Sequence, residues 1–154
     1  MQDFVHLHVH TQYSLLDGQA SVARLVDKAM KNGMKGIAVT DHGNMFGIKE
    51  FTNYVNKKNS GPKGEIKDLK KRIAEIEAGT VECEDKEAEI AACKAKIVEA
   101  ENKLFKPIIG CEMYVARRTM DLKEGKPDQS GYHLIVLAKN EKGYHNLILS
   151  LIHI

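Results

Sequence analysis

The sequence predicts an α/β fold with a largely parallel sheet, on three observations. Short apolar runs alternate along the chain with stretches of helical periodicity, an order typical of strands joined by crossover helices. One of these runs, GIAVT at 36–40, is continuously apolar, which is typical of a parallel strand buried on both faces. The chain has 154 residues, of which 43% are hydrophobic and 29% charged, and this composition fits one globular domain with a sizeable core.

The predicted elements begin with a strand, a helix and a second strand. FVHLHVH at 4–10 alternates apolar residues with histidines, so the histidines are expected to share one face of a strand. ASVARLVDKAMKNG at 20–33 is expected to form an amphipathic helix that is capped by Ser21 and ends before Gly33. GIAVT is the second strand, and Asn44 is expected to cap a second helix over 44–58.

The C-terminal third predicts two more strands and a closing helix. KPIIGCEMYVA at 106–116 and YHLIVLAK at 132–139 are strands, and NEKGYHNLILSLI at 140–152 is a helix. Between these two strands, RRTMDLKEGKPDQSG at 117–131 is a polar loop, long enough to be functional or disordered.

Residues 63–106 form a segment of different character, with 10 basic and 11 acidic residues. Apolar residues recur in it at helical spacing in two blocks that are separated by AGTVECED, which predicts an antiparallel helical hairpin inserted into the domain. The hairpin contains no histidine, so we expect a charged projection that contributes no metal ligand. The expected seam consists of Ile66, Leu69, Ile73 and Ile76 against Ile90, Cys93, Ile97 and Leu104.

Cysteine usage and hydropathy bear on the compartment. The three cysteines, Cys83, Cys93 and Cys111, form no C-x-x-C pair, so free thiols in a reducing compartment are expected. No apolar run approaches the ~20 residues that span a bilayer, and the N-terminus does not resemble a signal peptide. We therefore expect a cytoplasmic protein without a membrane partner. The net charge of +2 is too small to indicate nucleic acid by itself.

Ligand-type side chains recur where the predicted strands begin or end. Because functional groups collect at the carboxyl ends of parallel strands, these side chains are expected to converge. For HLHVH alone, a half-exposed strand with solvent-facing histidines is the plain alternative, but the recurrence favours a metal site. Imidazole and carboxylate suit Zn²⁺, Mn²⁺ or Fe²⁺, and more ligands than one ion needs indicate two or three ions and phosphoester hydrolysis. The residues are His8, His10, Asp17, Asp41, His42, Glu112 and His133.

Five short motifs together resemble the first motifs of the PHP (polymerase and histidinol phosphatase) domain. They are HLHVHT, SLLDG, TDHGN, PIIGCEMYV and GYHLIVLAKN, and the resemblance covers about 3–60 and 104–149. It implies a distorted seven-stranded (βα) barrel with up to three metal ions at its C-terminal face. It also implies either 3′–5′ exonuclease activity or a degenerate site that serves for docking.

The resemblance carries over to residues of the first motif and of the loop after it. His8 and His10 stand where the family has its paired histidine ligands, and Asp17 stands where the following loop supplies a ligand. His6 lies earlier on the same strand face and is expected at most to contact the ligands without binding metal itself.

The later motifs carry over in the same way. His42 matches the ligand of the second motif, and Asp41 beside it is expected to act in catalysis by orienting that imidazole. Glu112 matches the carboxylate that bridges metal ions, and His133 matches the ligand of the fourth strand. Every position holds a residue able to bind metal, which favours a loaded site.

The family's remaining ligands would lie beyond residue 154, so we expect the N-terminal part of a larger protein and a truncated barrel. Four parallel strands cannot close a barrel of seven. The chain alone is expected to self-associate through 133–139 and 147–152, and to hydrolyse substrates feebly or not at all.

Three functions follow from the resemblance. The first is an exonuclease module of a bacterial replicative DNA polymerase, with DNA and other polymerase subunits as partners. The second is a non-catalytic module that stabilises the polymerase and docks a proofreading subunit. The third is a stand-alone phosphatase of the histidinol-phosphate type. SLLDG, GNMFG and PIIGCEMYV favour the polymerase readings.

Overall fold

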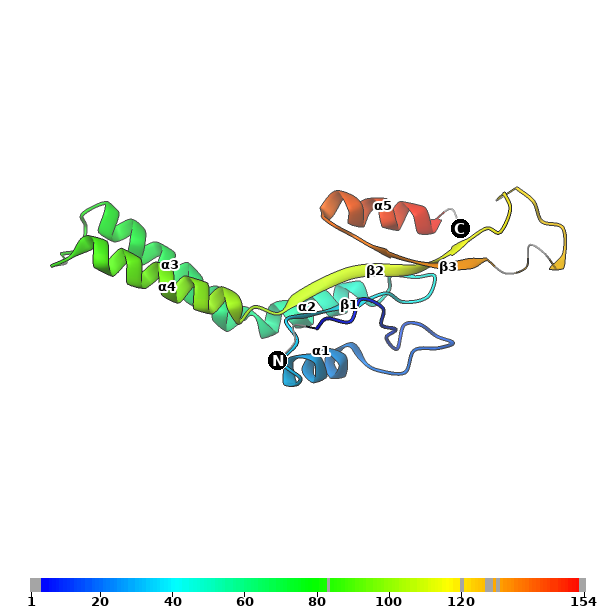
Figure 1. Cartoon of the computed structure of the whole chain (residues 1–154), viewed down its shortest axis with the longest axis horizontal. Coiled ribbons are helices and arrows are strands. Elements are labelled where there is room, and N and C mark those ends of the chain that lie inside the picture. Colours follow the sequence, from blue (N-terminus) through cyan, green and yellow to red (C-terminus); the bar gives the residue numbers. More distant parts are fainter. Residues whose placement is uncertain (1–3, 83, 120, 127–128, 130, 153–154) are drawn as a thin grey trace. The chain divides into compact units, whose positions relative to one another are not determined.

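The computed structural model describes residues 4–82, 84–119, 121–126, 129 and 131–152, and it divides into two compact units. One unit comprises residues 1–54 and 106–154, and the other comprises residues 55–105 (Figure 1). The elements found in the described part are α1 (Val22–Lys31), β1 (Gly36–Val39), α2 (Ile48–Lys58), α3 (Ser60–Glu77), α4 (Lys86–Asn102), β2 (Lys106–Val115), β3 (Tyr132–Leu137) and α5 (Glu141–Ile152).

Helix α1 has the bounds and the buried face that its sequence predicts. The Ser21 side chain accepts a hydrogen bond from the backbone N–H of Arg24, which caps the helix. Gly33 follows the last turn with φ of 76°, a backbone conformation that glycine adopts without strain. Val22 and Val26 are fully buried, so the apolar face of α1 contributes to the core of the first unit.

The sheet is mixed rather than largely parallel, and it is an open sheet of three strands in the described residues, with no closed barrel. The order is β1-β2-β3; β1 is parallel to β2, as predicted, and all four of its residues are buried. Strand β3 runs antiparallel to β2, which corrects the expected parallel arrangement. A parallel pair needs a crossover connection, usually an α-helix, whereas the described residues between β2 and β3 form a polar loop without an α-helix.

Residues 4–10 do not form the regular strand that their alternation predicts. They run extended beside β1, where the N–H groups of Ala38 and Thr40 donate to the carbonyls of His6 and Val9. From His6 to Val9 this segment advances by three residues, whereas the chain beside it advances by two. One extra residue on one side of a pair is typical of a β-bulge, and the segment also bends at Leu7. The Val9 N–H bonds the Thr40 hydroxyl at 3.0 Å instead of a main-chain carbonyl. The irregularity interrupts the alternation that placed His6 beside the later histidines.

The second helix, α2, begins at Ile48, four residues later than predicted, and Asn44 does not cap it. Instead, the Asn44 side chain accepts from the Phe46 N–H at 3.2 Å and donates to the carbonyl of Tyr13 at 3.0 Å. Asn44 therefore holds the turn at 41–47 against the loop at 11–18. A short side chain with both donor and acceptor suits this bridging role as well as it suits a cap.

The second unit contains the two helices expected between β1 and β2, and α3 packs along α4 (Figure 1). Ile76, Cys93 and Ala100 are buried on the expected seam, and Asp85 caps α4 through the Ala88 N–H. Helix α3 begins at Ser60, before the expected start at 63. The buried Asn59 side chain ties the two ends of this unit together, because it donates to the Phe105 carbonyl at 2.8 Å and accepts from its N–H at 2.9 Å.

Within the first unit, α5 lies on one side of the sheet and α1 on the other (Figure 1). Cys93 and Cys111 are free thiols, as expected, whereas Cys83 lies outside the described residues. Burial raises the pKa of the Cys111 thiol to about 11, so the protonated Sγ donates to the Asp41 carbonyl at 3.3 Å. None of the described helices combines the length and apolarity that crossing a bilayer would require.

Candidate metal centre

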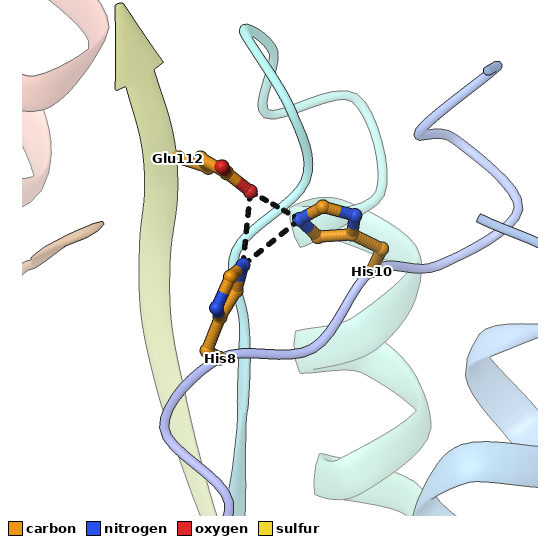
Figure 2. A group of neighbouring side chains, drawn as sticks. All are labelled: His8, His10 and Glu112. Atoms are coloured by element: carbon orange, nitrogen blue, oxygen red, sulfur yellow. Dashed lines mark hydrogen bonds and ion pairs between the residues drawn. The ribbon is translucent and has the colours of Figure 1, made fainter. Parts of the chain in front are cut away.

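Two imidazoles and one carboxylate converge where the segment 4–10 faces β2. Figure 2 shows His8 and His10 reaching toward Glu112. His8 Nε2 lies 2.9 Å and His10 Nε2 lies 2.5 Å from the same oxygen, Glu112 Oε2, and the two nitrogens are 3.1 Å apart. Glu112 is buried and the His8 side chain is half exposed, so this group opens toward solvent on the His8 side.

A second group lies on the other oxygen of the same carboxylate. His133 Nδ1 is 2.7 Å from Glu112 Oε1, and one possible ligand atom each from His42, Glu112 and His133 lie within 4.8 Å of one another. His42 lies three residues after the end of β1 and is brought here by an isolated parallel bridge to Glu112. The antiparallel course of β3 brings His133, because the start of β3 then lies beside the end of β2.

Asp17 lies behind two of these imidazoles. Its Oδ1 is 3.0 Å from His10 Nδ1, and its Oδ2 is 3.1 Å from His42 Nδ1. The pKa of Asp17 is lowered to about 2, first by a hydrogen bond from Ser14 and next by one from His42, so the carboxylate is ionised and only accepts. Both Nδ1 atoms therefore donate to Asp17, which leaves both Nε2 atoms available as ligands. A carboxylate in this position fixes the tautomer and the direction of an imidazole ligand.

The donor set fits a divalent cation. In the described residues, His42 Nε2 is buried and has no hydrogen-bond partner. Facing lone pairs on His8, His10 and Glu112 repel unless a positive charge lies among them. Ligand atoms held ~2.0–2.1 Å from one ion lie about 3 Å apart at right angles, close to the spacing of the first group. A cation in each group would be held by these atoms and would balance their lone pairs.

Burial by itself would raise the pKa of the Glu112 carboxyl, but hydrogen bonds from His8 and His10 outweigh burial and lower its pKa below the ordinary value. Glu112 is therefore ionised near neutral pH, in the form that binds metal.

Asp41 has different partners from those that the sequence suggested. Both oxygens of its buried carboxylate accept from Thr11, one from the backbone N–H at 2.6 Å and the other from the hydroxyl at 2.8 Å. Burial raises the pKa of Asp41 more than the two hydrogen bonds lower it. In this structure Asp41 fastens the end of the first motif to the end of β1 through these two hydrogen bonds. His6 packs its ring edge-on against Phe4, 4.7 Å between centroids.

Three residues near the groups were not anticipated from the sequence. Thr11 and Ser14 are fully buried; Ser14 donates to Asp17 Oδ1 at 2.6 Å and accepts from the His42 N–H at 3.0 Å. Tyr114 lies two residues after Glu112 on the same strand face and stacks on His42. The period of two along β2 could have indicated Tyr114. The sequence distinguishes Thr11 and Ser14 only as polar residues between His10 and Asp17.

Comparison with known proteins agrees with this geometry. The PHP domain matches residues 6–154, including the hairpin that the motif resemblance left out. The DNA polymerase III subunit alpha of Treponema pallidum is 39% identical over 147 residues, which are 95% of this chain and 9% of that protein. The corresponding subunit of Borreliella burgdorferi is 38% identical over 148 residues, 94% of this chain and 9% of that protein. The corresponding subunit of Aquifex aeolicus is 32% identical over 153 residues, which are 96% of this chain and 9% of that protein.

The chain spans only 9% of the length of these relatives. The match nevertheless extends over nearly all of the chain and includes every histidine and carboxylate of the two groups. The resemblance that the motifs indicated is thereby confirmed, and this chain belongs to the PHP domain family.

Proposed function

We propose that this chain is a metal-dependent phosphoesterase module, of the 3′–5′ exonuclease type, within a bacterial replicative DNA polymerase. The observation that carries the proposal is the Glu112 carboxylate, whose two oxygens each face a separate histidine group. Two cation positions that share one carboxylate are typical of sites that hydrolyse phosphoesters.

The residues divide into ligands and supports under this proposal. His8, His10 and Glu112 hold one divalent ion, and His42, Glu112 and His133 hold another, with Zn²⁺, Mn²⁺ or Fe²⁺ suited to nitrogen and carboxylate oxygen. Asp17 orients His10 and His42 through their Nδ1 atoms rather than acting as a ligand. This assignment modifies the sequence-based expectation for Asp17.

When bound, divalent ions would polarise a phosphoryl oxygen and lower the pKa of a coordinated water. The chain's own contribution is orientation and charge. Buried Glu112 keeps a negative charge between the two histidine groups, and the ionised Asp17 keeps the Nε2 atoms of His10 and His42 directed inward. The half-exposed side chains of His8 and His133 leave an open side from which a phosphate could approach.

The relatives' printed name supports the polymerase context. Each is a DNA polymerase III subunit alpha, and this chain aligns with 9% of its length. We propose by this analogy that DNA is the substrate and that other replicative polymerase subunits are partners. A non-catalytic docking module and a histidinol-phosphatase-type enzyme are the alternatives that the experiment below separates.

Metal analysis and hydrolysis assays on the purified chain test this proposal. Dialysis against Mn²⁺ or Zn²⁺ is expected to load about two ions per chain, the number of histidine groups found. The loaded chain should release nucleotides slowly from the 3′ end of single-stranded DNA, and His8→Ala with His10→Ala should abolish the release. His145→Ala, an exposed histidine on α5, is the matched control.

The three functions give different results in that experiment. Hydrolysis restricted to small phosphomonoesters would favour the phosphatase. Bound metal without hydrolysis of any phosphoester, both by this chain and by a longer protein that carries the later motifs, would favour the docking module. A chain that takes up no metal would contradict the proposal itself.

We also propose that the isolated chain self-associates through the outer edge of β3. In the described residues β3 pairs only with β2, and its Tyr132 and Leu134 are more than half exposed. An open edge with exposed apolar side chains favours pairing with another chain. Sedimentation should therefore show concentration-dependent association, and Leu134→Lys should reduce it. Val98→Lys, at an equally exposed position of α4, should leave it unchanged; equal behaviour of the two variants would contradict the edge model.

A further inference from the structure

Tyr114 lies against both histidines of the second group. Its ring stacks on His42 with 4.6 Å between centroids and 27° between planes, and it meets His133 edge-on at 5.1 Å and 89°. The backbone accounts for this position, because Tyr114 follows Glu112 by two residues on β2 and pairs directly with His133 on β3. Tyr114 therefore shares a face with the Glu112 carboxylate.

The Tyr114 ring restrains His42 in a direction that the hydrogen bond of His42 does not. The bond from His42 Nδ1 to Asp17 fixes one direction within the imidazole plane. It does not fix the tilt of that plane, and the tilt decides where the buried Nε2 points. A stacked aromatic ring resists this tilt because it contacts the whole face of the imidazole.

His133 has still fewer restraints. Its side chain is half exposed and lies on β3, and the contact of its Nδ1 with Glu112 holds only one end of the ring. The edge-on contact with Tyr114 is a cross-strand pair, the kind of contact that orders side chains on antiparallel strands. His42 and His133 also meet each other at 4.6 Å and 69°, so the three rings form one cluster.

The turn after β1 accommodates the Tyr114 ring. Gly43 has φ of +66°, and a Cβ built on it would lie 3.6 Å from Tyr114 Cε2, in van der Waals contact. The Gly43 N–H donates to the Glu112 carbonyl at 2.9 Å, which fastens this turn to β2 beneath the ring. The stack thus rests on backbone that is itself hydrogen-bonded to the ligand strand.

We infer that Tyr114 is a positioning residue for the second metal group, and that its aromatic ring rather than its hydroxyl performs this role. The inference rests on the proposed function only in assuming that His42, Glu112 and His133 bind a divalent ion. It predicts an asymmetric effect, because Tyr114 contacts both histidines of the second group while His8 and His10 of the first group have other neighbours.

Zn²⁺ titration against a chelating dye tests the inference on the full chain, with Co²⁺ absorption as a second readout of ligand geometry. Tyr114→Ala should weaken the second Zn²⁺ by about 10–100-fold, the usual effect of losing a residue that orients metal ligands. Binding of the first Zn²⁺ should stay at the wild-type value. Tyr114→Phe should bind both ions as the wild type does, because it keeps the ring.

Two further variants separate positioning from packing. Tyr114→Leu retains apolar bulk without an aromatic face, so it should fold and still lose affinity for the second Zn²⁺. Tyr132→Ala removes an exposed tyrosine from the neighbouring strand, on the opposite face of the β2–β3 pair, and should change neither ion. If Tyr114→Ala does not fold, the comparison of the leucine and phenylalanine variants decides the question.

The outcomes distinguish this inference from the proposed function. A wild-type chain that binds two Zn²⁺ while Tyr114→Leu binds both equally well would overturn the role of Tyr114 and leave the metal centre standing. Loss of the second ion in Tyr114→Phe would overturn the role of the ring and assign it to the hydroxyl. A wild-type chain that binds no second Zn²⁺ would overturn both proposals.

Discussion

Glu112→Gln is expected to abolish tight metal binding at both histidine groups. Its carboxylate is shared by both possible metal groups, with Oε2 facing His8 and His10 and Oε1 facing His133. Glutamine has nearly the same size, but it has no charge and presents an N–H₂ group where one of these oxygens lies. We expect each ion to bind more than about 100-fold more weakly, beyond the usual 10–100-fold cost of losing a residue that only orients a ligand.

Calorimetric titration with Zn²⁺ or Mn²⁺ measures this effect, and circular dichroism shows whether the variant is folded. Glu141→Gln is the matched control, because it removes the same charge from an 89% exposed side chain on α5. The control should bind metal as the wild type does. Retention of one tight ion by Glu112→Gln would mean that the two groups do not depend on a shared carboxylate.

The elements of the first unit could be predicted where local sequence decides the structure. Ser21 and Gly33 bracket α1, and the continuous apolar run at 36–40 marks the buried parallel strand. The orientation of β3 could not be predicted from its own residues, because the alternation of side chains along a strand is the same for parallel and antiparallel pairing. Only the absence of helical periodicity in the loop before β3 could have indicated a hairpin.

The irregularity of residues 4–10 depends on a contact distant in sequence. The Val9 N–H bonds the Thr40 hydroxyl, so the regular ladder with β1 is broken, although the alternation of histidines would suit an ideal strand. The same irregularity explains why His6 packs on Phe4 instead of joining the ligand groups. Alternation predicts which face a side chain takes only while the ladder is regular.

Residue types could be predicted for the metal centre, but not the division of roles. His8, His10, His42, Glu112 and His133 all lie in the two groups, because the extended segment 4–10, the turn after β1 and strands β2 and β3 carry them to neighbouring positions. The places of Asp17 and Asp41 depend on two buried hydroxyls, Ser14 and Thr11. Such pairings depend on loop conformation, which a single sequence does not reveal.

The loop that carries Asp17 has one position where only glycine fits. A Cβ added at Gly18 would lie 1.8 Å from the Thr11 carbonyl oxygen and 2.9 Å from the Ser14 Cβ. That carbonyl accepts from the Ser14 N–H, and the Ser14 carbonyl accepts from the Gly18 N–H at 2.7 Å. The obstructing atoms are therefore backbone held in two successive turns, and they cannot move aside without breaking those turns.

Gly18→Ala should consequently destabilise the fold and displace Asp17 together. Overpacking of a rigid site costs typically 1–3 kcal/mol, and a clash with backbone this close belongs at about 3 kcal/mol or above. For a chain of this size, about 3 kcal/mol lowers the melting temperature by roughly 6–12 °C. Because Asp17 orients His10 and His42, the variant should also bind metal more weakly under conditions in which it is still folded.

Thermal unfolding monitored by circular dichroism, followed by metal titration well below the transition, measures both effects. Gly64→Ala is the matched control: an added Cβ there meets no atom within 4 Å, and Gly64 lies in α3, in the other unit. Alanine favours a helix over glycine by up to about 1 kcal/mol, so the control should melt at or slightly above the wild-type temperature. If Gly18→Ala melted with the wild type and kept its metal affinity, the loop at 11–18 would have to adopt a different backbone, and the orientation of His10 and His42 by Asp17 would need another explanation.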